Sequence, residues 1–204
     1  MKLYENSLDQ FTQALASKTS VPGGGGAAAA AAAIGVALGD MVGEFTLGKK
    51  KYAAVEEDIK SLMDQAQALR GQLLECIEED AAAFEPLSKA YGISKEDPDR
   101  DKIMENCLRQ AAQPPFHILE LACKSLDIVE QFADKGSVIV LSDAACGAAL
   151  LRGALLSAAA NVKINTKSMK DREYADSLNA KTNQLVEKYS QLADDIFNKV
   201  YSKY

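Results

Sequence analysis

The sequence contains no tryptophan and one histidine, and aromatic residues make up only 6% of its 204 residues. Hydrophobic residues still make up 48% of the chain, so most of the apolar content is alanine, leucine and valine. A core of such small side chains favours closely packed helices over a wide β-sandwich. The length suits one domain. We therefore expect a single domain over residues 1–204.

The chain also lacks closely paired cysteines. Its four cysteines stand far apart in apolar surroundings, with no Cys-x-x-Cys spacing, which favours buried free thiols. The N-terminal residues MKLYENSLDQF show no long apolar run of the kind found in signal peptides. We therefore expect reduced thiols, no metal site and a cytoplasmic protein. The cysteines are Cys76, Cys107, Cys123 and Cys146.

An excess of positive charge is absent as well. The formal net charge is −6, which argues against a nucleic-acid-binding surface. The longest apolar stretch, Ala27 to Leu47, is long enough to span a membrane but carries Asp40 and Glu44. Charges in the middle of a span are costly in lipid, so we expect no membrane segment.

The most distinctive stretch that is present joins a glycine run to an alanine run. Pro22 and Gly23–Gly26 lead into seven alanines, and alanine is the best helix former, which predicts a helix over about Ala27–Thr46. A glycine loop at a helix N-terminus presents free N–H groups that suit an anion. A buried helix with a glycine-rich entry turn and no ligand is the alternative interpretation. Three lysines, Lys49–Lys51, follow and are expected to attract an anionic ligand.

Apolar residues recur at three- and four-residue spacing along most of the remaining chain, which indicates amphipathic helices. Ser7 and Gln10 predict a capping box at the start of a short first helix. Pro114 and Pro115 are expected to end one helix and begin the next. The whole pattern predicts an all-α bundle of six or seven helices, with long central helices and two Ala-rich helices. Beyond the first Ala-rich helix, the expected segments are a helix from Tyr52 to near Tyr91, helices over Asp99–Ala112 and Pro114–Ala133, an extended loop over Ser137–Leu141, a second Ala-rich helix over Asp143–Asn161 capped by Ser142, and a last helix over Lys170–Tyr201.

Two carboxylates stand beside small apolar helix residues. Asp80 precedes three alanines, and Asp143 opens the second Ala-rich helix. Apolar surroundings disfavour the charged form of a carboxyl, which raises its pKa towards the range useful for proton transfer. A capping role for Asp143 and a solvated position for Asp80 are equally compatible with the sequence. Asn161 and Asn165 by default predict hydrogen bonds between helices, and His117 is expected to be structural.

These motifs, in this order and at these spacings, resemble the cyclodeaminase/cyclohydrolase family, the C-terminal domain type of formiminotransferase-cyclodeaminase. The resemblance spans nearly the whole chain. Two departures are visible: Gly26 stands where the family usually has serine, and Ser137 and Ile139 stand where it usually has asparagine. The matching motifs are Pro22-Gly23-Gly24-Gly25 before the alanine run, Met41-Val42, Thr46, Gly48-Lys49-Lys50-Lys51-Tyr52, Asp80-Ala81 with Phe84, Ser142-Asp143, and Asn161-Val162 with Asn165.

The resemblance implies an all-helical homodimer that acts on one-carbon-substituted tetrahydrofolate without a metal. The implied activity is formiminotetrahydrofolate cyclodeaminase, which forms 5,10-methenyltetrahydrofolate and ammonia. The alternatives are a methenyltetrahydrofolate cyclohydrolase of the same family, or a non-catalytic helical dimer that binds folate or a protein partner. Asp80 and Asp143 are the expected catalytic residues, and we expect the whole site to meet in one hollow between helices. The residues expected to bind substrate are Pro22, Gly23, Gly24, Gly25, Lys49, Lys50, Lys51, Tyr52, Ser142, Asn161 and Asn165.

Overall fold

Helices make up almost all of the structure, a computed structural model that describes residues 2–204. Within that range there are six α-helices, three short 3-10 helices and no strand, so the predicted all-α bundle is confirmed. In chain order the elements are η1 (Leu3–Glu5), α1 (Leu8–Leu15), α2 (Gly24–Glu44), η2 (Lys50–Val55), α3 (Glu56–Ala90), α4 (Arg100–Lys135), η3 (Val138–Val140), α5 (Leu141–Lys167) and α6 (Arg172–Tyr201).

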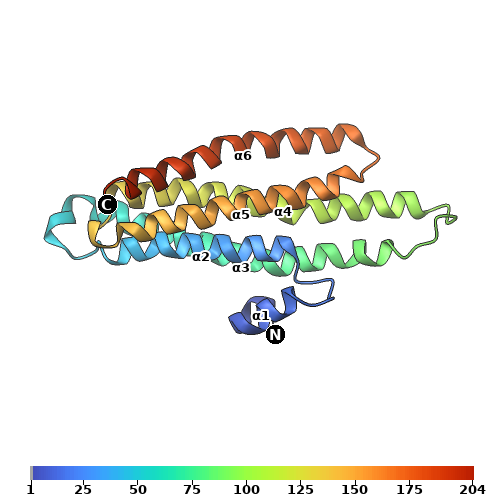
Figure 1. Cartoon of the computed structure of the whole chain (residues 1–204), viewed down its shortest axis with the longest axis horizontal. Coiled ribbons are helices and arrows are strands. Elements are labelled where there is room, and N and C mark those ends of the chain that lie inside the picture. Colours follow the sequence, from blue (N-terminus) through green and yellow to red (C-terminus); the bar gives the residue numbers. More distant parts are fainter. Residues whose placement is uncertain (1) are drawn as a thin grey trace.

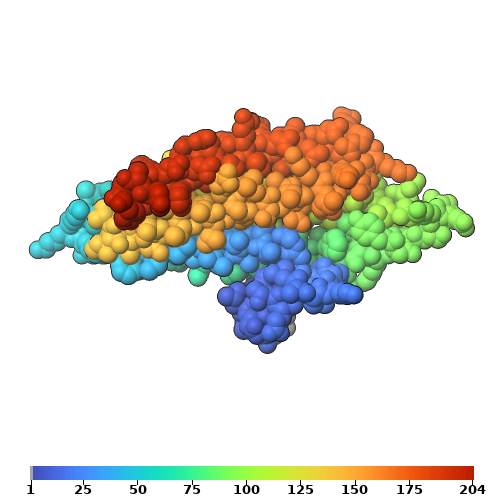
Figure 2. Space-filling view, viewed as in Figure 1, coloured from blue at the N-terminus to red at the C-terminus, as the bar shows by residue number. Residues whose placement is uncertain are grey.

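The helices α2, α3, α4 and α5 form an elongated bundle, and α6 lies along α4 and α5 (Figure 1). The short α1 projects from the body of the bundle (Figure 2). The two Ala-rich helices, α2 and α5, approach each other very closely. A Cβ on Gly35 would lie 2.8 Å from Cγ of Leu151, and one on Gly147 would lie 2.7 Å from the carbonyl oxygen of Gly35. Glycine is required at both positions because any side chain would collide.

Helix α2 begins earlier than the sequence predicts. The expected start at Ala27 is wrong because the glycines already adopt the helical conformation, and the N–H of Ala27 donates to the carbonyl oxygen of Gly23 at 3.0 Å. Gly23 is the N-cap of the helix. The glycine run is therefore the first helical turn and not a loop before it.

Helix α4 runs without interruption through Pro114 and Pro115, so the predicted break is wrong. A proline inside a helix leaves the carbonyl four residues earlier without its usual donor. For Pro115 that carbonyl belongs to Ala111, and Nδ2 of Asn165 on α5 donates to it at 3.0 Å. A hydrogen bond from a neighbouring helix thus replaces one that proline removes.

The segment before α5 also differs from expectation. The predicted extended loop over Ser137–Leu141 contains the 3-10 helix η3, and Val140 is the N-cap of α5. The predicted capping role of Ser142 is therefore wrong. The capping box of Ser7 and Gln10 is confirmed, because the N–H of Gln10 donates to Oγ of Ser7 at 3.2 Å.

Helix α2 is much shorter than the helices beside it. It has 21 residues, whereas α3 has 35 and α4 has 36. At about 1.5 Å per residue, α2 is roughly 30 Å long and its two neighbours are roughly 50 Å long. The bundle continues beyond the N-terminus of α2, which leaves a step there (Figure 1). The candidate site lies at this step, next to the N-terminus of α2.

Two segments are long and apolar enough to cross a membrane by length and composition, Gly24–Glu44 and Val138–Lys167. Shares of 56% and 44% of their apolar windows are buried against the rest of the bundle. A packed core helix passes the same test, so the absence of a membrane segment stays a prediction.

Candidate functional site

The first turn of α2 packs directly against a carboxylate of α3. The N–H of Gly26 donates to Oδ2 of Asp80 at 3.1 Å. A Cβ placed on Gly25 would lie 2.1 Å from Oδ1 of Asp80, so no side chain fits there. The glycine run thus lets the carboxylate reach the helix N-terminus, where unpaired N–H groups and the helix dipole favour a negative charge.

Asp80 is half-buried rather than fully solvated. Burial raises the pKa of its carboxyl, and the hydrogen bond from the Gly26 N–H opposes only part of this effect. Of the two environments that the sequence allowed for Asp80, apolar or solvated, the structure shows the more apolar one. A carboxyl with a raised pKa suits a role in which a proton is taken up and returned.

Two asparagines of α5 flank the same turn. Nδ2 of Asn165 donates to the carbonyl oxygens of Ala111 and Asn161, both at 3.0 Å. Nδ2 of Asn161 donates to the carbonyl oxygen of Ser157 at 2.8 Å, and a Cβ on Gly24 would lie 2.9 Å from that nitrogen. The predicted bond between helices is confirmed for Asn165, whereas Asn161 presents its amide to the glycine turn.

A cavity of about 150 Å³ lies where these elements meet. Asp80, Asn161 and Asn165 supply its polar groups, and Phe84 is part of its apolar wall. Phe84, which the matching motifs already included, lies one turn after Asp80. Ile164 lies one turn after Asn161, so helical spacing could have identified it as well. The wall residues that the sequence reasoning missed are Ser20, Val21, Ala111, Pro115 and Ile164. We call the following residues the glycine end: Gly23, Gly24, Gly25, Asp80, Phe84, Asn161 and Asn165.

The opposite end of α2 carries a second polar cluster. The N–H of Ser137 donates to Oγ1 of Thr46 at 2.8 Å, and Nζ of Lys49 donates to Oγ of Ser137 at 3.1 Å. The N–H of Val138 donates to the hydroxyl oxygen of Tyr52 at 3.2 Å, and this bond lowers the pKa of Tyr52. These contacts hold the lysine triplet in a defined turn. We call this cluster the lysine end, and it comprises Thr46, Lys49, Lys50, Lys51, Tyr52, Ser137 and Val138.

The two ends are too far apart to form one site within a chain. Helix α2 is about 30 Å long, and the stretch of α5 between Asp143 and Asn161 is about 27 Å long. The prediction that all the site residues meet in one hollow is therefore wrong for a single chain. Pro22 is buried and lies against Gly26 without lining the cavity. The predicted residues that the structure brings together are Gly23, Gly24, Gly25, Asp80, Asn161 and Asn165, and those it places towards the other end are Lys49, Lys50, Lys51, Tyr52, Ser142 and Asp143.

The one histidine lies outside this cavity, beside two side chains of α3. Nδ1 of His117 is 3.8 Å from Sγ of Cys76 and 3.8 Å from Oε2 of Glu79. Burial raises the pKa of the Cys76 thiol to about 12, so the thiol is protonated at neutral pH. The absence of a metal site stays a prediction. Cys146 is exposed, so the expectation that all four thiols are buried is wrong there.

Comparison with known proteins places the chain among folate enzymes. A sequence model of the formiminotransferase-cyclodeaminase family matches residues 7–184. The chain is 35% identical over 202 residues to methenyltetrahydrofolate cyclohydrolase of Methylorubrum extorquens, and the match covers 97% of each protein. It is 30% identical over 189 residues to formimidoyltransferase-cyclodeaminase of Mus musculus, a match that covers 91% of this chain and 35% of the mouse protein.

The structure agrees with these matches. It resembles the crystal structure of formiminotetrahydrofolate cyclodeaminase from Thermotoga maritima with a TM-score of 0.86 and 25% sequence identity, covering 98% of this chain and 100% of that chain. The family match includes both the glycine end and the lysine end. The chain therefore belongs to the formiminotransferase-cyclodeaminase family, as its ordered motifs predicted.

Proposed function

We propose that this protein is a methenyltetrahydrofolate cyclohydrolase, which opens the cationic ring of 5,10-methenyltetrahydrofolate with water. The observation that carries the proposal is the carboxyl of Asp80, held against the N-terminus of α2 in a cavity that also contains two asparagines. The similarity over the full length to a protein of that name supports this choice of reaction.

Ring opening requires the movement of protons at one carbon. Water adds to the carbon between N5 and N10 and loses a proton. One C–N bond then breaks as the new hydroxyl group releases its proton to solvent and becomes the carbonyl of a formyl group, and the freed nitrogen takes up a proton. Asp80 as a carboxylate accepts the proton from the attacking water and stabilises the positive charge of the ring. Its raised pKa favours return of that proton to the departing nitrogen.

The remaining groups of the glycine end suit the shape of the substrate. The side chain of Phe84 offers a flat apolar surface for the folate ring system. The amide of Asn161 and the N–H groups of the first turn of α2 offer hydrogen bonds to its polar edge. The glutamate tail of folate carries carboxylates, for which the lysine end of the second chain in a homodimer supplies matching cations.

Formiminotetrahydrofolate cyclodeaminase is the second candidate, and the similarity to the Thermotoga maritima structure favours it. In that reaction N10 attacks the formimino carbon and its proton passes to the formimino nitrogen. That nitrogen takes up a second proton and leaves as ammonia when its bond to carbon breaks. Protonated Asp80 is the donor for the departing ammonia. The same carboxyl therefore serves both reactions, and the substrate decides between them.

Two parallel assays distinguish these reactions. The purified protein is incubated with 5,10-methenyltetrahydrofolate and with the 5-formimino compound, and the methenyl absorbance is followed. Faster loss of absorbance than in protein-free buffer supports the hydrolase, and faster gain together with ammonia release supports the deaminase. The Asp80→Asn protein is the control in both assays. Spontaneous rates with both compounds would refute the enzymatic proposal and leave a non-catalytic folate- or partner-binding protein.

The wider setting of the reaction is part of the same proposal. We infer a homodimer in the cytoplasm that needs no metal and has no nucleic-acid or membrane partner. The net charge of −6 supports the absence of a nucleic-acid partner.

A further inference from the structure

A second polar hollow lies on the outside of the bundle, between α3 and α4. Its volume is about 340 Å³, and its polar lining includes Glu79 of α3 together with His117 and Glu120 of α4. No lysine or arginine is among the described residues that line it. The hollow therefore holds two carboxylates and an imidazole without a cation to neutralise them, which favours a positively charged ligand.

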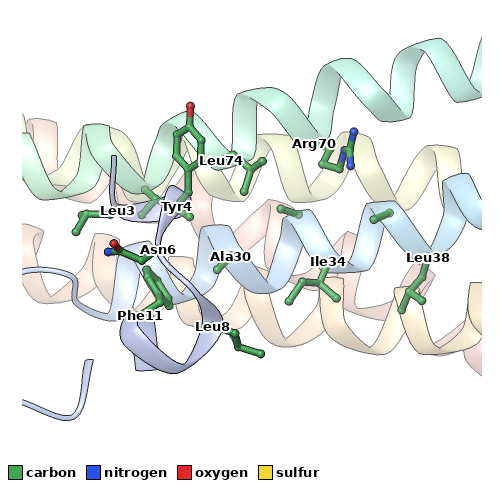
Figure 3. Close-up of a pocket in the computed structure, with 13 residues that line it drawn as sticks. Leu3, Tyr4, Asn6, Leu8, Phe11, Ala30, Ile34, Leu38, Arg70 and Leu74 are labelled. Carbon is green, nitrogen blue, oxygen red and sulfur yellow. The ribbon is translucent and has the colours of Figure 1, made fainter. Parts of the chain in front are cut away.

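The groove beside α1 has the opposite character. Its volume is about 460 Å³, and its lining is mainly aliphatic and aromatic. Figure 3 shows Leu8 and Phe11 of α1 beside Ala30 and Ile34 of α2, with Arg70 as the charged side chain of the lining. Aliphatic and aromatic side chains do not coordinate a metal ion. Of these two hollows, the one between α3 and α4 therefore offers the metal ligands.

A buried thiol adjoins the hollow between α3 and α4. Cys76 is fully buried on α3, and its Sγ is 3.8 Å from Nδ1 of His117. The same nitrogen is 3.8 Å from Oε2 of Glu79. The sulfur, the imidazole nitrogen and a carboxylate oxygen all lie within 4.8 Å of one another. Three different types of metal ligand thus converge on one point.

We propose that Cys76, Glu79 and His117 bind one zinc ion, with its fourth position open to the water of the hollow. In a tetrahedral zinc site, bonds of about 2.0–2.3 Å place neighbouring ligand atoms roughly 3.4–3.6 Å apart. The separations of 3.8 Å exceed that value by only a few tenths of an ångström. Glu79 and His117 are both exposed, so small rotations of their side chains close the difference.

Helix geometry explains why these residues converge. Cys76 and Glu79 are three residues apart on α3, so they lie on one face of that helix. Helix α4 packs along α3 and brings His117 to that face (Figure 1). Metal sites in helical bundles are built in this way, from side chains on facing helices. The expectation of no metal site rested on the spacing of the cysteines, which does not register ligands from two helices.

The ligand types select zinc over the hard cations. A thiolate and an imidazole suit zinc, whereas Mg²⁺ and Ca²⁺ prefer oxygen ligands. When the ion binds, the thiol of Cys76 releases its proton to water, because a coordinated thiol is deprotonated. Within the described residues Glu79 forms an ion pair with His117 and with no lysine or arginine, so no fixed cation competes with the zinc ion.

The zinc ion would lie near the glycine end without entering its cavity. Cys76 stands one turn before Asp80 on α3, but neither Cys76 nor His117 lines that cavity. A bound ion would therefore fix α3 against α4 beside Asp80 and take no part in the proton transfer. The inference is independent of the proposed function, whose reaction still needs no metal.

Cobalt binding tests the site directly, because Co²⁺ occupies zinc sites and absorbs light through charge transfer from a thiolate ligand. The metal-free protein in a Cys146→Ser background, which lacks the exposed native thiol, is titrated with Co²⁺ and then with Zn²⁺. We expect one ion per chain and a charge-transfer band that disappears as zinc displaces cobalt. Mg²⁺ and Ca²⁺ should not remove the band.

Two of the ligands are exposed, so they can be replaced without disturbing the core. We expect His117→Ala to weaken zinc binding by at least about 100-fold, since even changes outside the ligand set cost roughly 10–100-fold. Glu79→Gln should weaken it as well, and Cys76→Ser should abolish the cobalt band. Glu130→Gln is the matched control, because Glu130 is an exposed acid of α4 outside the hollow, and its zinc affinity should stay within about twofold of wild type.

Thermal unfolding supplies a second readout. Zinc at about a hundredfold excess over its Kd should raise the melting temperature of the Cys146→Ser protein by about 5–10 °C and leave that of the same protein with His117→Ala unchanged. A Cys146→Ser protein without a cobalt band overturns the inference. Unweakened zinc affinity in both His117→Ala and Glu79→Gln overturns it too, even if the Cys76→Ser protein fails to fold.

Discussion

The glycine end and the lysine end of α2 are built in opposite ways. At the glycine end the packing is so tight that a single methyl group on Gly25 would collide with the Asp80 carboxylate. At the lysine end a hydrogen-bonded turn presents cations to water, and Lys50 and Lys51 are both exposed. Tight packing positions a reacting group, whereas exposed cations attract and orient a charged one. From this difference we propose that the reaction belongs to the glycine end and substrate affinity to the lysine end.

The largest expected effect comes from filling the space at the glycine end. Gly25→Ala would push the Asp80 carboxylate out of place, and we expect kcat to fall on the order of 10³-fold. Gly23→Ala is the matched control, because its Cβ meets no atom within 4 Å and its kcat should stay within about twofold of wild type. Steady-state decay of methenyl absorbance measures both. Equal activity of the two variants would contradict the claim that tight packing at the glycine end positions the reacting group.

Removal of the cations at the lysine end should weaken binding of the folate and leave the chemical step unchanged. We expect alanine in place of Lys49–Lys51 to raise KM for the folate about tenfold, because charge-assisted hydrogen bonds to its carboxylates are lost. The value of kcat should stay near that of wild type. Added salt should raise the wild-type KM and reduce the difference between the two proteins. A drop in kcat at unchanged KM would place the lysines in the chemical step instead.

A third prediction concerns the scaffold that supports the glycine end. Asn165→Leu leaves the Ala111 carbonyl without its donor, so we expect the free energy of unfolding in urea to fall by about 1–3 kcal/mol. Pro115→Ala returns an N–H to α4 that can donate to that carbonyl. The double variant should therefore recover much of the loss. No recovery would mean that Asn165 stabilises the bundle in another way.

The smallest expected effect is on stability at different pH values. Because burial raises the pKa of Asp80, the folded protein keeps a proton that the unfolded chain loses above pH about 3.9. The stability of the wild type therefore falls as pH rises from there through the folded pKa. We expect Asp80→Asn to melt at a higher temperature than wild type at pH 7. Below pH about 3.9, where Asp80 is protonated in both the folded and the unfolded chain, the two proteins should melt at the same temperature. Thermal unfolding followed by circular dichroism measures this, and a lower melting temperature at pH 7 would contradict it.

The sequence predicted the all-α fold and the order of the helices well, because the apolar periodicity and the alanine runs are local signals. It was wrong where a distant residue decides the local structure. The break expected at Pro114 and Pro115 does not occur, because Asn165 on another helix donates to the Ala111 carbonyl. The glycine run was expected to be a loop, because its fit against Asp80 is invisible without the fold.

The candidate site was predictable only in part for the same reason. Asp80, Asn161 and the glycines lie together as expected, since their motifs fall where three helices cross. The order of motifs along the chain carries no information on how far apart they lie in space. The prediction therefore merged Asp143 and the lysine triplet with a site at the far end of α2, roughly 30 Å away.

The central claim is that Asp80 performs the proton transfer, and a single-turnover measurement tests it most directly. Wild-type and Asp80→Asn proteins are mixed in excess with 5,10-methenyltetrahydrofolate, and the decay of the bound methenyl absorbance is followed alongside the Kd of the folate. We predict that the variant slows this step by about 10²–10⁴-fold while its Kd stays within a few-fold of wild type. A variant that turns over its bound folate at the wild-type rate would contradict the account.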